Sequence, residues 1–481
     1  MYLKNLHIKG FRCFPEYTID FAPGVTVLFG KNGSGKTTLI NAIHKALSFV
    51  MHSEKVKEKD PKTKKAKVID VLSIRNNNPY VNVEGYSKVG DVYMVGAKRG
   101  DITIDIDAEA EIDGNPISWS MSAYAINCRL RPSEYKEAFS SFYQWHKSTG
   151  KYPLLAYYSD GYPHLGASGT LTKSEKSKAS FIAKNNFPEI AYTDWNSDEG
   201  CTKMWIVRLE TKMRNAELLH RRIMLLETSK NPHSAIYAPS ISEELYNNSI
   251  QELPAVENEI NEIIGVLKNF SADDSNISID TIELSIHDSH LSIIANDGKR
   301  YAFRNLPAGY KRLFYMVLDI AYRSYILSDR QTTNISGLVI IDEIDLHLHP
   351  QLEQVVLQRL TKTFPSVQFI VSTHSPLVLT GIKTETKTNC VLKMVPDSDE
   401  PERLENIHGI DYNLMLEDNM NVSKRDPDIQ DDFDKAWQQV AEKNIEGAKA
   451  TLKQLEENTP GNQVELIKLR AMISRIEMIG R

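Results

Sequence analysis

The sequence predicts an α/β fold in which two distant parts of the chain build one mixed β-sheet, with a helical insertion between them and a helical tail after them. Two fully apolar runs rich in β-branched residues, at 25–29 and 337–341, are typical of buried parallel strands. Segments at 102–112 and 277–303 instead alternate apolar and polar residues around hairpin turns, which is typical of half-exposed strands. The pattern is mainly helical at 130–270 and 428–479.

The composition is that of an ordinary soluble chain. Of its 481 residues, 41% are hydrophobic and 25% are charged, and the formal net charge of −6 neither requires nor excludes nucleic acid. The four cysteines are far apart and form no CxxC pair, so we expect neither a zinc site nor a disulfide framework. No apolar run could span a bilayer and the N-terminus lacks a signal-peptide pattern. We therefore expect a cytoplasmic protein with no membrane partner.

The first apolar run, VTVLF, leads directly into a glycine-rich loop, GKNGSGKTT, that satisfies the pattern GxxxxGK[ST]. Glycines allow such a loop to turn its backbone N–H groups toward phosphate oxygens, and a helix N-terminus favours anions. We expect Lys36 to reach the β- and γ-phosphates of ATP and Thr37 to hold Mg²⁺. The predicted nucleotide-binding residues are Gly30, Lys31, Asn32, Gly33, Ser34, Gly35, Lys36, Thr37 and Thr38.

The second apolar run belongs to the stretch GLVIIDEIDLHLHP, which is rich in carboxylates and imidazoles. Taken alone, Asp345, His347 and His349 suggest a separate metal cluster. Paired with the glycine-rich loop, the stretch predicts the other half of a nucleotide site. Asp342, at the end of a parallel strand, then supplies the second ligand for Mg²⁺, and Glu343 polarises a water for attack on the γ-phosphate. We favour the paired reading.

Lys36 and Asp342 are so far apart in the chain that a large segment must separate the two strands, which argues against kinases and small GTPases. Three features narrow the choice further. LPAGYKRLF places Gly309 at the start of an apolar-periodic helix, FPSVQFIVSTHSPLVL ends a strand near His374, and DLHLHP follows the acidic strand. In this order they resemble the signature loop, the switch histidine and the D-loop of ABC-type ATPase heads of the SMC, Rad50, RecF and OLD group.

This resemblance implies a P-loop ABC-ATPase head that pairs with a second copy around two ATP molecules. Each ATP would be held by the P-loop of one copy and by Gly309 on the signature helix of the other, while His374 senses the γ-phosphate and Asp345 crosses the dimer seam. One feature departs from the family pattern: Pro307 stands where the signature motif has serine. Backbone N–H groups, helped by Lys311 or Arg312, would then have to bind the phosphate, and we expect slow hydrolysis.

GKNGSGKTT, IIDEIDLHLHPQLEQ, FPSVQFIVSTHSPLVL and LEDNMNV together look like the ATPase of bacterial anti-phage systems, the Septu PtuA family and its retron-associated relatives. What that family implies is a multimeric ATPase that controls a separately encoded HNH-type nuclease. In retron versions a reverse transcriptase and its RNA–DNA hybrid join the complex. The alternative function is an SMC- or RecF-like DNA-repair or DNA-binding ATPase. No nuclease motif is evident, so we expect ATPase activity without intrinsic nuclease activity.

The predicted division has four parts: an N-terminal half of the head (1–128), a mainly helical insertion (129–272), a C-terminal half of the head (273–400) and a helical interaction region (401–481). The best helix of the insertion, at 209–227, lacks sustained heptads, so we expect a compact insertion rather than a long coiled-coil arm. The lysine-rich stretch EKVKEKDPKTKKAK is either a solvated loop or a nucleic-acid contact. Three amphipathic helices are predicted at 428–479.

Overall fold

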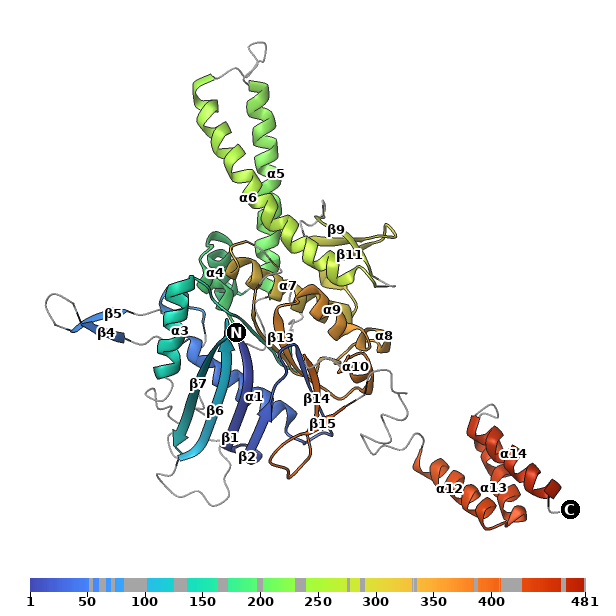
Figure 1. Ribbon diagram of the computed structural model, residues 1–481. Coiled ribbons are helices and arrows are strands. Elements are labelled where there is room, and N and C mark those ends of the chain that lie inside the picture. Colours follow the sequence, from blue (N-terminus) through green and yellow to red (C-terminus); the bar gives the residue numbers. More distant parts are fainter. Residues whose placement is uncertain are drawn as a thin grey trace. The chain divides into compact units, whose positions relative to one another are not determined.

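The chain forms two compact units, Met1–His408 and Gly409–Arg481, and each is described by itself. Figure 1 shows the computed structural model, in which a sheet-containing body and a projecting pair of helices make up the first unit. The structure describes residues 1–51, 55–59, 66–70, 74–81, 102–124, 136–162, 172–196, 202–229, 239–274, 277–285, 290–330, 332, 335–384, 388–405, 407, 426–459 and 464–479.

A six-stranded mixed sheet forms the core of the first unit. Its spatial order is β15-β14-β3-β13-β12-β8, and all neighbours are parallel except β15 and β14. Every residue of β3, β8, β12 and β13 is buried, which explains the continuous apolar runs of the sequence. The strands are β3 (Val25–Phe29), β8 (Leu154–Tyr158), β12 (Gly337–Ile341), β13 (Val367–Thr373), β14 (Asn389–Lys393) and β15 (Glu402–Leu404).

Helices follow the parallel strands of this sheet. The helix after β3 starts at the glycine-rich loop, and the helix before β12 is buried at every position from Arg312 to Leu327. That degree of burial explains why the second helix is apolar on nearly all sides. These helices are α1 (Lys36–Leu47), α7 (Ala308–Leu327), α8 (Pro350–Glu353), α9 (Val356–Thr363) and α10 (Pro376–Thr380).

Two further sheets contain the alternating segments. A four-stranded antiparallel sheet has the order β2-β1-β6-β7, and a separate three-stranded sheet has the order β11-β10-β9. The half-exposed strands and their hairpin turns were predicted, and the two segments lie in separate sheets. Alternation reports only that one face is buried; it does not say against which partner. The strands are β1 (Tyr2–Phe11), β2 (Phe14–Asp20), β6 (Ile102–Ile112), β7 (Asn115–Tyr124), β9 (Ile279–Leu284), β10 (Leu291–Ala295) and β11 (Arg300–Ala302).

The insertion is built around an antiparallel pair of long helices, α5 (Thr202–Ser229) and α6 (Pro239–Ser271), which project together from the first unit (Figure 1). The prediction of a compact insertion is therefore wrong. Ala216, Leu219 and Val256 form a buried cluster in the seam between the two helices, with Leu253 and Ile260 packed against it. So short a seam leaves no sustained heptad pattern in the sequence. We call this pair the α5–α6 hairpin.

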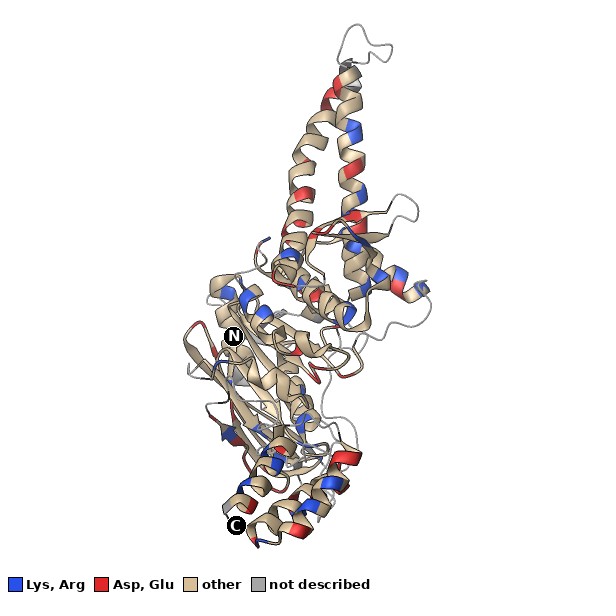
Figure 2. Ribbon diagram, turned by 90° about the vertical axis from the view of Figure 1, so that its right-hand side faces the viewer, with Lys and Arg blue, Asp and Glu red and all other residues tan. Residues whose placement is uncertain are grey.

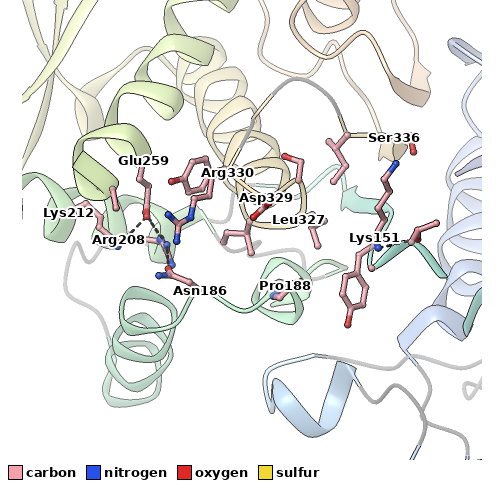
Figure 3. Close-up of a pocket in the computed structure, with 18 of the residues that line it drawn as sticks. Lys151, Asn186, Pro188, Arg208, Lys212, Glu259, Leu327, Asp329, Arg330 and Ser336 are labelled. Carbon is pink, nitrogen blue, oxygen red and sulfur yellow. Dashed lines mark hydrogen bonds and ion pairs between the residues drawn. The ribbon is translucent and has the colours of Figure 1, made fainter. Parts of the chain in front are cut away.

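A cavity of about 790 Å³ lies at the base of the α5–α6 hairpin (Figure 3). One side of it is formed by Arg208, whose guanidinium binds Glu259 through both carboxylate oxygens and also binds Asn186. Lys212 pairs with the same glutamate at 3.2 Å. None of the predicted nucleotide-binding residues lines this cavity.

Three observations bear on the predicted four-part division. The range 129–272 is mainly helical, yet it also contributes β8, which pairs with β12 in the central sheet. At the other boundary, β15 lies beyond residue 400 but belongs to the same sheet through β14. Strand-like LLAYY was missed because a short apolar run between helices looks like helix core. The boundaries of the four parts stay a prediction.

The remaining short elements of the first unit include the lysine-rich stretch. Its two ends form strands that pair antiparallel, while residues 60–65 between them lie outside the described residues, as does LEDNMNV at 416–422. Whether the stretch contacts nucleic acid stays a prediction. The elements are β4 (Lys55–Lys59), β5 (Ala66–Asp70), α2 (Ile74–Asn77), α3 (Lys136–Thr149) and α4 (Lys173–Lys184).

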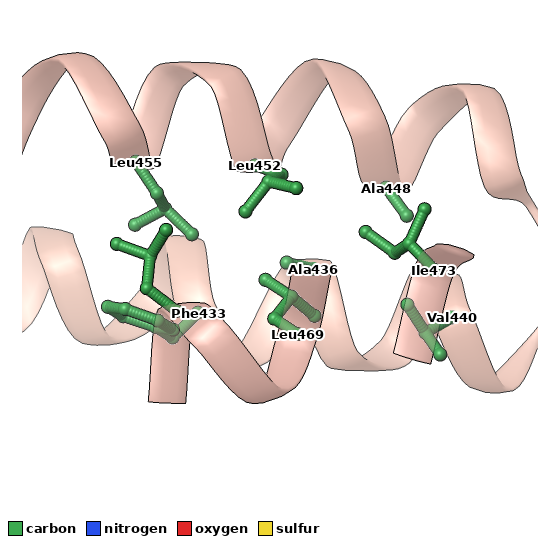
Figure 4. Close-up of a cluster of buried hydrophobic side chains, with 9 residues drawn as sticks. Phe433, Ala436, Val440, Ala448, Leu452, Leu455, Leu469 and Ile473 are labelled. Atoms are coloured by element: carbon green, nitrogen blue, oxygen red, sulfur yellow. The ribbon is translucent and has the colours of Figure 1, made fainter. Parts of the chain in front are cut away.

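The second unit is a three-helix bundle, as predicted from the three amphipathic segments. Its helices are α12 (Pro427–Ala441), α13 (Ile445–Asn458) and α14 (Val464–Ile479). Asp426 caps α12 and Asn444 caps α13, each through a side-chain oxygen that accepts a backbone N–H. The core is a single layer of apolar side chains, shown in Figure 4: Phe433, Ala436, Val440, Ala448, Leu452, Leu455, Leu466, Leu469 and Ile473.

Candidate nucleotide site

The two motifs that are distant in sequence end at the same edge of the central sheet. Strand β13 lies between β3 and β12, and all three are parallel. Their carboxyl ends therefore bring the glycine-rich loop, Asp342 and the Thr373–His374 segment together. The backbone of Asp342 is fixed on the other side by β8, because its N–H donates to the Tyr158 carbonyl at 2.7 Å.

The glycine-rich loop needs its glycines at specific points. Gly35 caps α1 with a φ of 94°, and a Cβ there would lie 2.6 Å from Cζ of Phe14. Gly30 has a φ of 154°, and a Cβ would lie 2.8 Å from the Met394 carbonyl oxygen. The loop tip at 31–33 is exposed, as is Thr37. The loop therefore presents backbone groups and the Thr37 hydroxyl to solvent at a helix N-terminus.

Lys36 is held inside this loop. It is 5% exposed, and its ammonium donates to the carbonyl oxygens of Gly30 at 2.8 Å and of Lys31 at 2.9 Å. Burial lowers the pKa of Lys36 to about 8, while the nearby Asp342 and Glu343 oppose that shift. A positive group held at the loop by neutral carbonyls is positioned to meet phosphate oxygens.

Asp342 is the most buried carboxylate of the site. One of its oxygens accepts the Ser372 hydroxyl hydrogen, whereas Oδ2 is buried and has no hydrogen-bond partner among the described residues. Burial raises the pKa of Asp342, and the neighbouring hydroxyls of Ser372 and Thr37 oppose that shift. A buried carboxylate oxygen without a partner, beside a threonine hydroxyl, is a donor set that fits Mg²⁺, a hard cation that prefers oxygen ligands.

Glu343 follows directly and adopts an unusual backbone conformation. Its φ is 49°, in the left-handed region that non-glycine residues rarely occupy, and its N–H donates to Oγ of Ser372 at 2.8 Å. A carboxylate oxygen of Glu343 lies 4.0 Å from Nε2 of His374. Burial, then Asp342, raises the pKa of Glu343; burial, then Lys36, lowers the pKa of His374. The pair therefore favours a neutral imidazole beside the glutamate.

The loop after Glu343 is explained by local structure. Asp345 accepts the Thr373 hydroxyl at 2.6 Å, and Nδ1 of His349 accepts the Gln351 N–H at the start of α8. The described residues contain no group of three or more His, Cys, Asp or Glu side chains that could hold a metal ion. The separate metal cluster weighed from the sequence is therefore not supported in this part of the chain.

The signature segment packs against that loop. A Cβ on Gly309 would lie 2.5 Å from the His347 carbonyl oxygen, so only glycine allows this approach of α7. The Tyr310 hydroxyl donates to Asp274 at 2.7 Å, and the Lys311 ammonium donates to the Arg304 carbonyl at 2.8 Å. The predicted contact of Gly309 with a nucleotide held by another copy stays a prediction.

Arg312 does not have the predicted orientation. Instead of facing a second copy, it is 2% exposed, and its guanidinium donates to the carbonyl oxygens of Asp342 at 2.9 Å and Ser159 at 3.5 Å. Its Nε and Nη1 have no hydrogen-bond partner among the described residues. Burial lowers the pKa of Arg312, while the charges of Asp345, Glu343 and Asp342 oppose the shift. Arg312 is thus a cation beside the acidic groups of its own chain.

Sequence reasoning also missed the residues that other strands contribute. Ser372 joins Asp342 to Glu343, and its place in the strand VQFIVST was the available signal. Asp160, just beyond the end of β8, adds negative charge that raises the pKa of both Asp342 and Glu343. No local motif marks Asp160, because its relevance arises only from the pairing of β8 with β12.

No helix within the described residues is both long enough and apolar enough to cross a membrane.

Known proteins resemble this chain, two of them over most of its length. It is 28% identical over 415 residues to the Retron Vc95 probable ATPase of Vibrio cholerae serotype O1 biovar El Tor, covering 80% of this chain and 72% of that protein. It is 23% identical over 461 residues to the Retron Ec83 probable ATPase of Escherichia coli, covering 88% and 77%. A Septu protein PtuA of Bacillus thuringiensis is 31% identical over 140 residues, covering 27% and 33%.

These relatives confirm the resemblance to ATPases of retron and Septu systems that the motifs predicted. The family profile described as "RecF/RecN/SMC N terminal domain" matches residues 2–394, which include the glycine-rich loop, the acidic strand and the His374 segment. This match spans the predicted halves of the head and the insertion between them. The chain belongs to the RecF/RecN/SMC N-terminal domain family.

Proposed function

We propose that this protein is a regulatory ATPase whose ATP-dependent pairing of heads controls a separately encoded effector nuclease in a bacterial anti-phage complex. The observation that carries the ATPase part is the convergence of Lys36, Thr37 and Asp342 at one sheet edge, where Thr37 and Lys36 are close enough to Asp342 to influence its pKa. Residues from both ends of the head thus meet where a triphosphate and its metal would lie.

The chemistry follows from the side chains of this edge. Lys36 would leave the loop carbonyls for the β- and γ-phosphates, and the backbone N–H groups of the loop would bind the remaining phosphate oxygens. Thr37 and Asp342 would hold Mg²⁺, which supplies positive charge beside the phosphates. Glu343 would accept a proton from the attacking water, and His374 would donate a hydrogen bond to the γ-phosphate.

A second copy would complete each site through the N-terminus of α7. The family resemblance assigns that role to Gly309, and Asp345 to the dimer seam. Because Pro307 replaces the signature serine and Arg312 is committed to Asp342, the opposing phosphate would depend on backbone N–H groups. We therefore expect slow hydrolysis. A slow rate fits a regulatory ATPase that stays in its ATP-bound state for a long time rather than a motor that cycles rapidly.

The partners are proposed from the relatives. Two of them are named as retron ATPases and one as a Septu protein. We propose an HNH-type nuclease as the effector, with a reverse transcriptase and RNA–DNA hybrid as further candidates if this chain works with a retron. The matches to the two retron ATPases cover 80% and 88% of this chain, which favours this function over that of a DNA-repair ATPase.

Nucleotide binding and pairing can be tested with Lys36→Ala, using Lys9→Ala, an exposed lysine of β1 outside the site, as the matched control. ATP with Mg²⁺ should shift the wild type and the control toward dimers in sedimentation experiments, and Lys36→Ala should lose both binding and the shift. The proposal fails if Lys36→Ala binds ATP as tightly as the control. Co-expression with the neighbouring genes tests the effector and should recover a complex with an HNH-type nuclease. Binding of DNA ends by the chain alone, without nucleotide, would instead support the DNA-repair function.

A further inference from the structure

The outer half of the α5–α6 hairpin leaves large apolar side chains uncovered. On α5, Leu218 is 60% exposed, Met224 62% and Leu225 59%; on α6, Leu245 is 45% and Ile250 41% exposed. These five make up half of the large exposed hydrophobic side chains among the described residues, although the hairpin is a small part of the chain. Such a concentration of exposed apolar surface marks an interaction site.

These side chains are not needed for the hairpin itself. Its own seam is filled by Ala216, Leu219 and Val256. Leu218 and Leu225 are separated by two helical turns, so both lie on one side of α5, about a quarter turn from the position of Leu219. The exposed stripe therefore lies on a flank of the hairpin, outside the seam between α5 and α6.

The two helices of the hairpin also carry opposite charge (Figure 2). α5 contains six Lys or Arg and three Glu, whereas Pro239 to Leu267 of α6 contains six Glu and no Lys or Arg. Near the base, this complementarity is used within the chain by Arg208 and Glu259 at 2.6 Å. Farther out, Arg222 is exposed and forms no ion pair with any residue that the structure describes; the same holds for Glu243 and Glu244.

We propose that the outer half of the α5–α6 hairpin docks onto the hairpin of a second copy of this chain. A two-fold axis between identical hairpins sets α5 of one copy against α6 of the other, and the reverse pairing follows by symmetry. The outer part of α5, which has three Arg and two Glu, then faces the outer part of α6, which has three Glu and no Lys or Arg, around the apolar stripe of Leu218 and Leu225. A hairpin that carries both charges on neighbouring helices is complementary to itself.

The contact is small. The part of α5 from Arg214 to Ser229 is about 24 Å long and a helix pair is about 20 Å wide, so one face covers about 500 Å². Two such faces bury about 1,000 Å², near the lower limit for a specific interface. We therefore expect weak, reversible association that works beside pairing of the heads, and it should not need ATP.

The test uses the full chain without nucleotide, in sedimentation velocity over a range of protein concentrations. The wild type should associate reversibly, and Leu218→Gln combined with Leu225→Gln should weaken that association at least tenfold. The matched control is Val464→Gln with Ile467→Gln in the C-terminal bundle, where the native side chains are 68% and 50% exposed. A wild type that stays monomeric, or a hairpin variant that associates like the control, overturns the proposal.

A charge exchange identifies the occupant. Arg222→Glu in one preparation and Glu243→Arg with Glu244→Arg in another should each weaken self-association, because like charges then meet across the two-fold axis. Mixing the two preparations should restore association, since α5 of each variant now faces an oppositely charged α6. Folding damage cannot produce this recovery. A mixture that associates no better than either variant alone overturns the proposed contact between two copies.

Discussion

The nucleotide site contains buried polar atoms without hydrogen-bond partners in the described part of the chain, whereas the outer α5–α6 hairpin exposes apolar side chains to solvent. At the sheet edge, Oδ2 of Asp342, Oγ of Ser159 and two nitrogens of Arg312 are buried without a hydrogen-bond partner among the described residues. On the hairpin, Leu218 and Leu225 are apolar and open to solvent. Both arrangements cost stability in the isolated chain. Buried polar groups fit a small charged ligand, whereas an exposed apolar stripe fits another protein surface.

Two buried arginines show the same contrast. Arg208, at the hairpin base, is 1% exposed, and its guanidinium is surrounded by the Glu259 carboxylate, the Asn186 side chain and backbone carbonyls. The Glu259 partner raises the pKa of Arg208 against the effect of burial. Arg312, at the nucleotide site, is as buried but only partly bonded, and burial lowers its pKa. The guanidinium of Arg208 is fully engaged within the fold, whereas Arg312, beside Asp342, keeps two nitrogens unbonded within the part of the chain that the structure describes.

The largest expected effect is on the chemical step. Glu343→Gln should lower the ATPase rate by about 10²- to 10⁴-fold, because the amide cannot accept a proton from water. ATP binding should stay within about twofold, since ATP contacts come from the loop. Glu353→Gln on α8 is the matched control, a glutamate whose pKa burial also raises but which bonds Ser375. Normal turnover by Glu343→Gln, measured as phosphate release, would remove the catalytic assignment.

The next largest effects are expected for substitutions of the two buried arginines, Arg208 and Arg312. Arg208→Met should destabilise the protein by about 3–5 kcal/mol, because it leaves Glu259 buried beside only Lys212. Arg312→Met should cost clearly less stability, since part of that guanidinium is unbonded, but it should lower the ATPase rate by about tenfold, on the order of 1.4 kcal/mol. Chemical denaturation and phosphate release measure the two effects. Equal destabilisation by both variants would show that Arg312 is structural too.

A buried histidine outside the nucleotide site tests whether a polar side chain without hydrogen-bond partners lowers the stability of the fold. His44 on α1 is 2% exposed, stacks on Tyr157 with ring centroids 4.7 Å apart, and neither ring nitrogen has a partner among the described residues. Burial lowers the pKa of His44 to about 3. Below about pH 6.5, the unfolded chain binds a proton that the folded chain refuses. Stability should therefore fall as pH drops from about 6.5 toward 3.

His44→Phe should remove this term. The free energy of unfolding of the variant minus that of the wild type should be about 2 kcal/mol larger at pH 5 than at pH 7.5. Urea denaturation at the two pH values measures it. A constant difference between the two proteins at both pH values would mean that His44 is not buried as a neutral group.

The smallest expected effect is on the stability of the hairpin surface. Leu218→Gln should change the free energy of unfolding by less than about 0.5 kcal/mol, because an exposed side chain buries little area in the monomer. Leu219→Gln, one position away and 2% exposed, should destabilise clearly. Thermal unfolding at a concentration below self-association compares them. Similar losses for both would show that Leu218 is part of the hairpin's own packing.

Much of the fold follows from local patterns. The apolar runs predicted β3, β12 and β13, and alternation predicted the β6–β7 hairpin. The three tail helices were predicted from their amphipathic helical period. Errors arose where a pattern is ambiguous. The short run LLAYY was not separated from its helical surroundings, and the hairpin was taken as compact because its seam is too short to show heptads.

By itself, the sequence determined the residues with recognisable chemistry: the loop around Lys36, the acidic pair Asp342 and Glu343, and His374. Each sits in a short motif whose residue types and order carry the information. Only the tertiary structure decided that Ser372 bridges the acidic pair and that Arg312 faces its own chain. These roles depend on which strands are neighbours and on which way a buried side chain points. Such contacts join residues far apart in sequence, so no local periodicity records them.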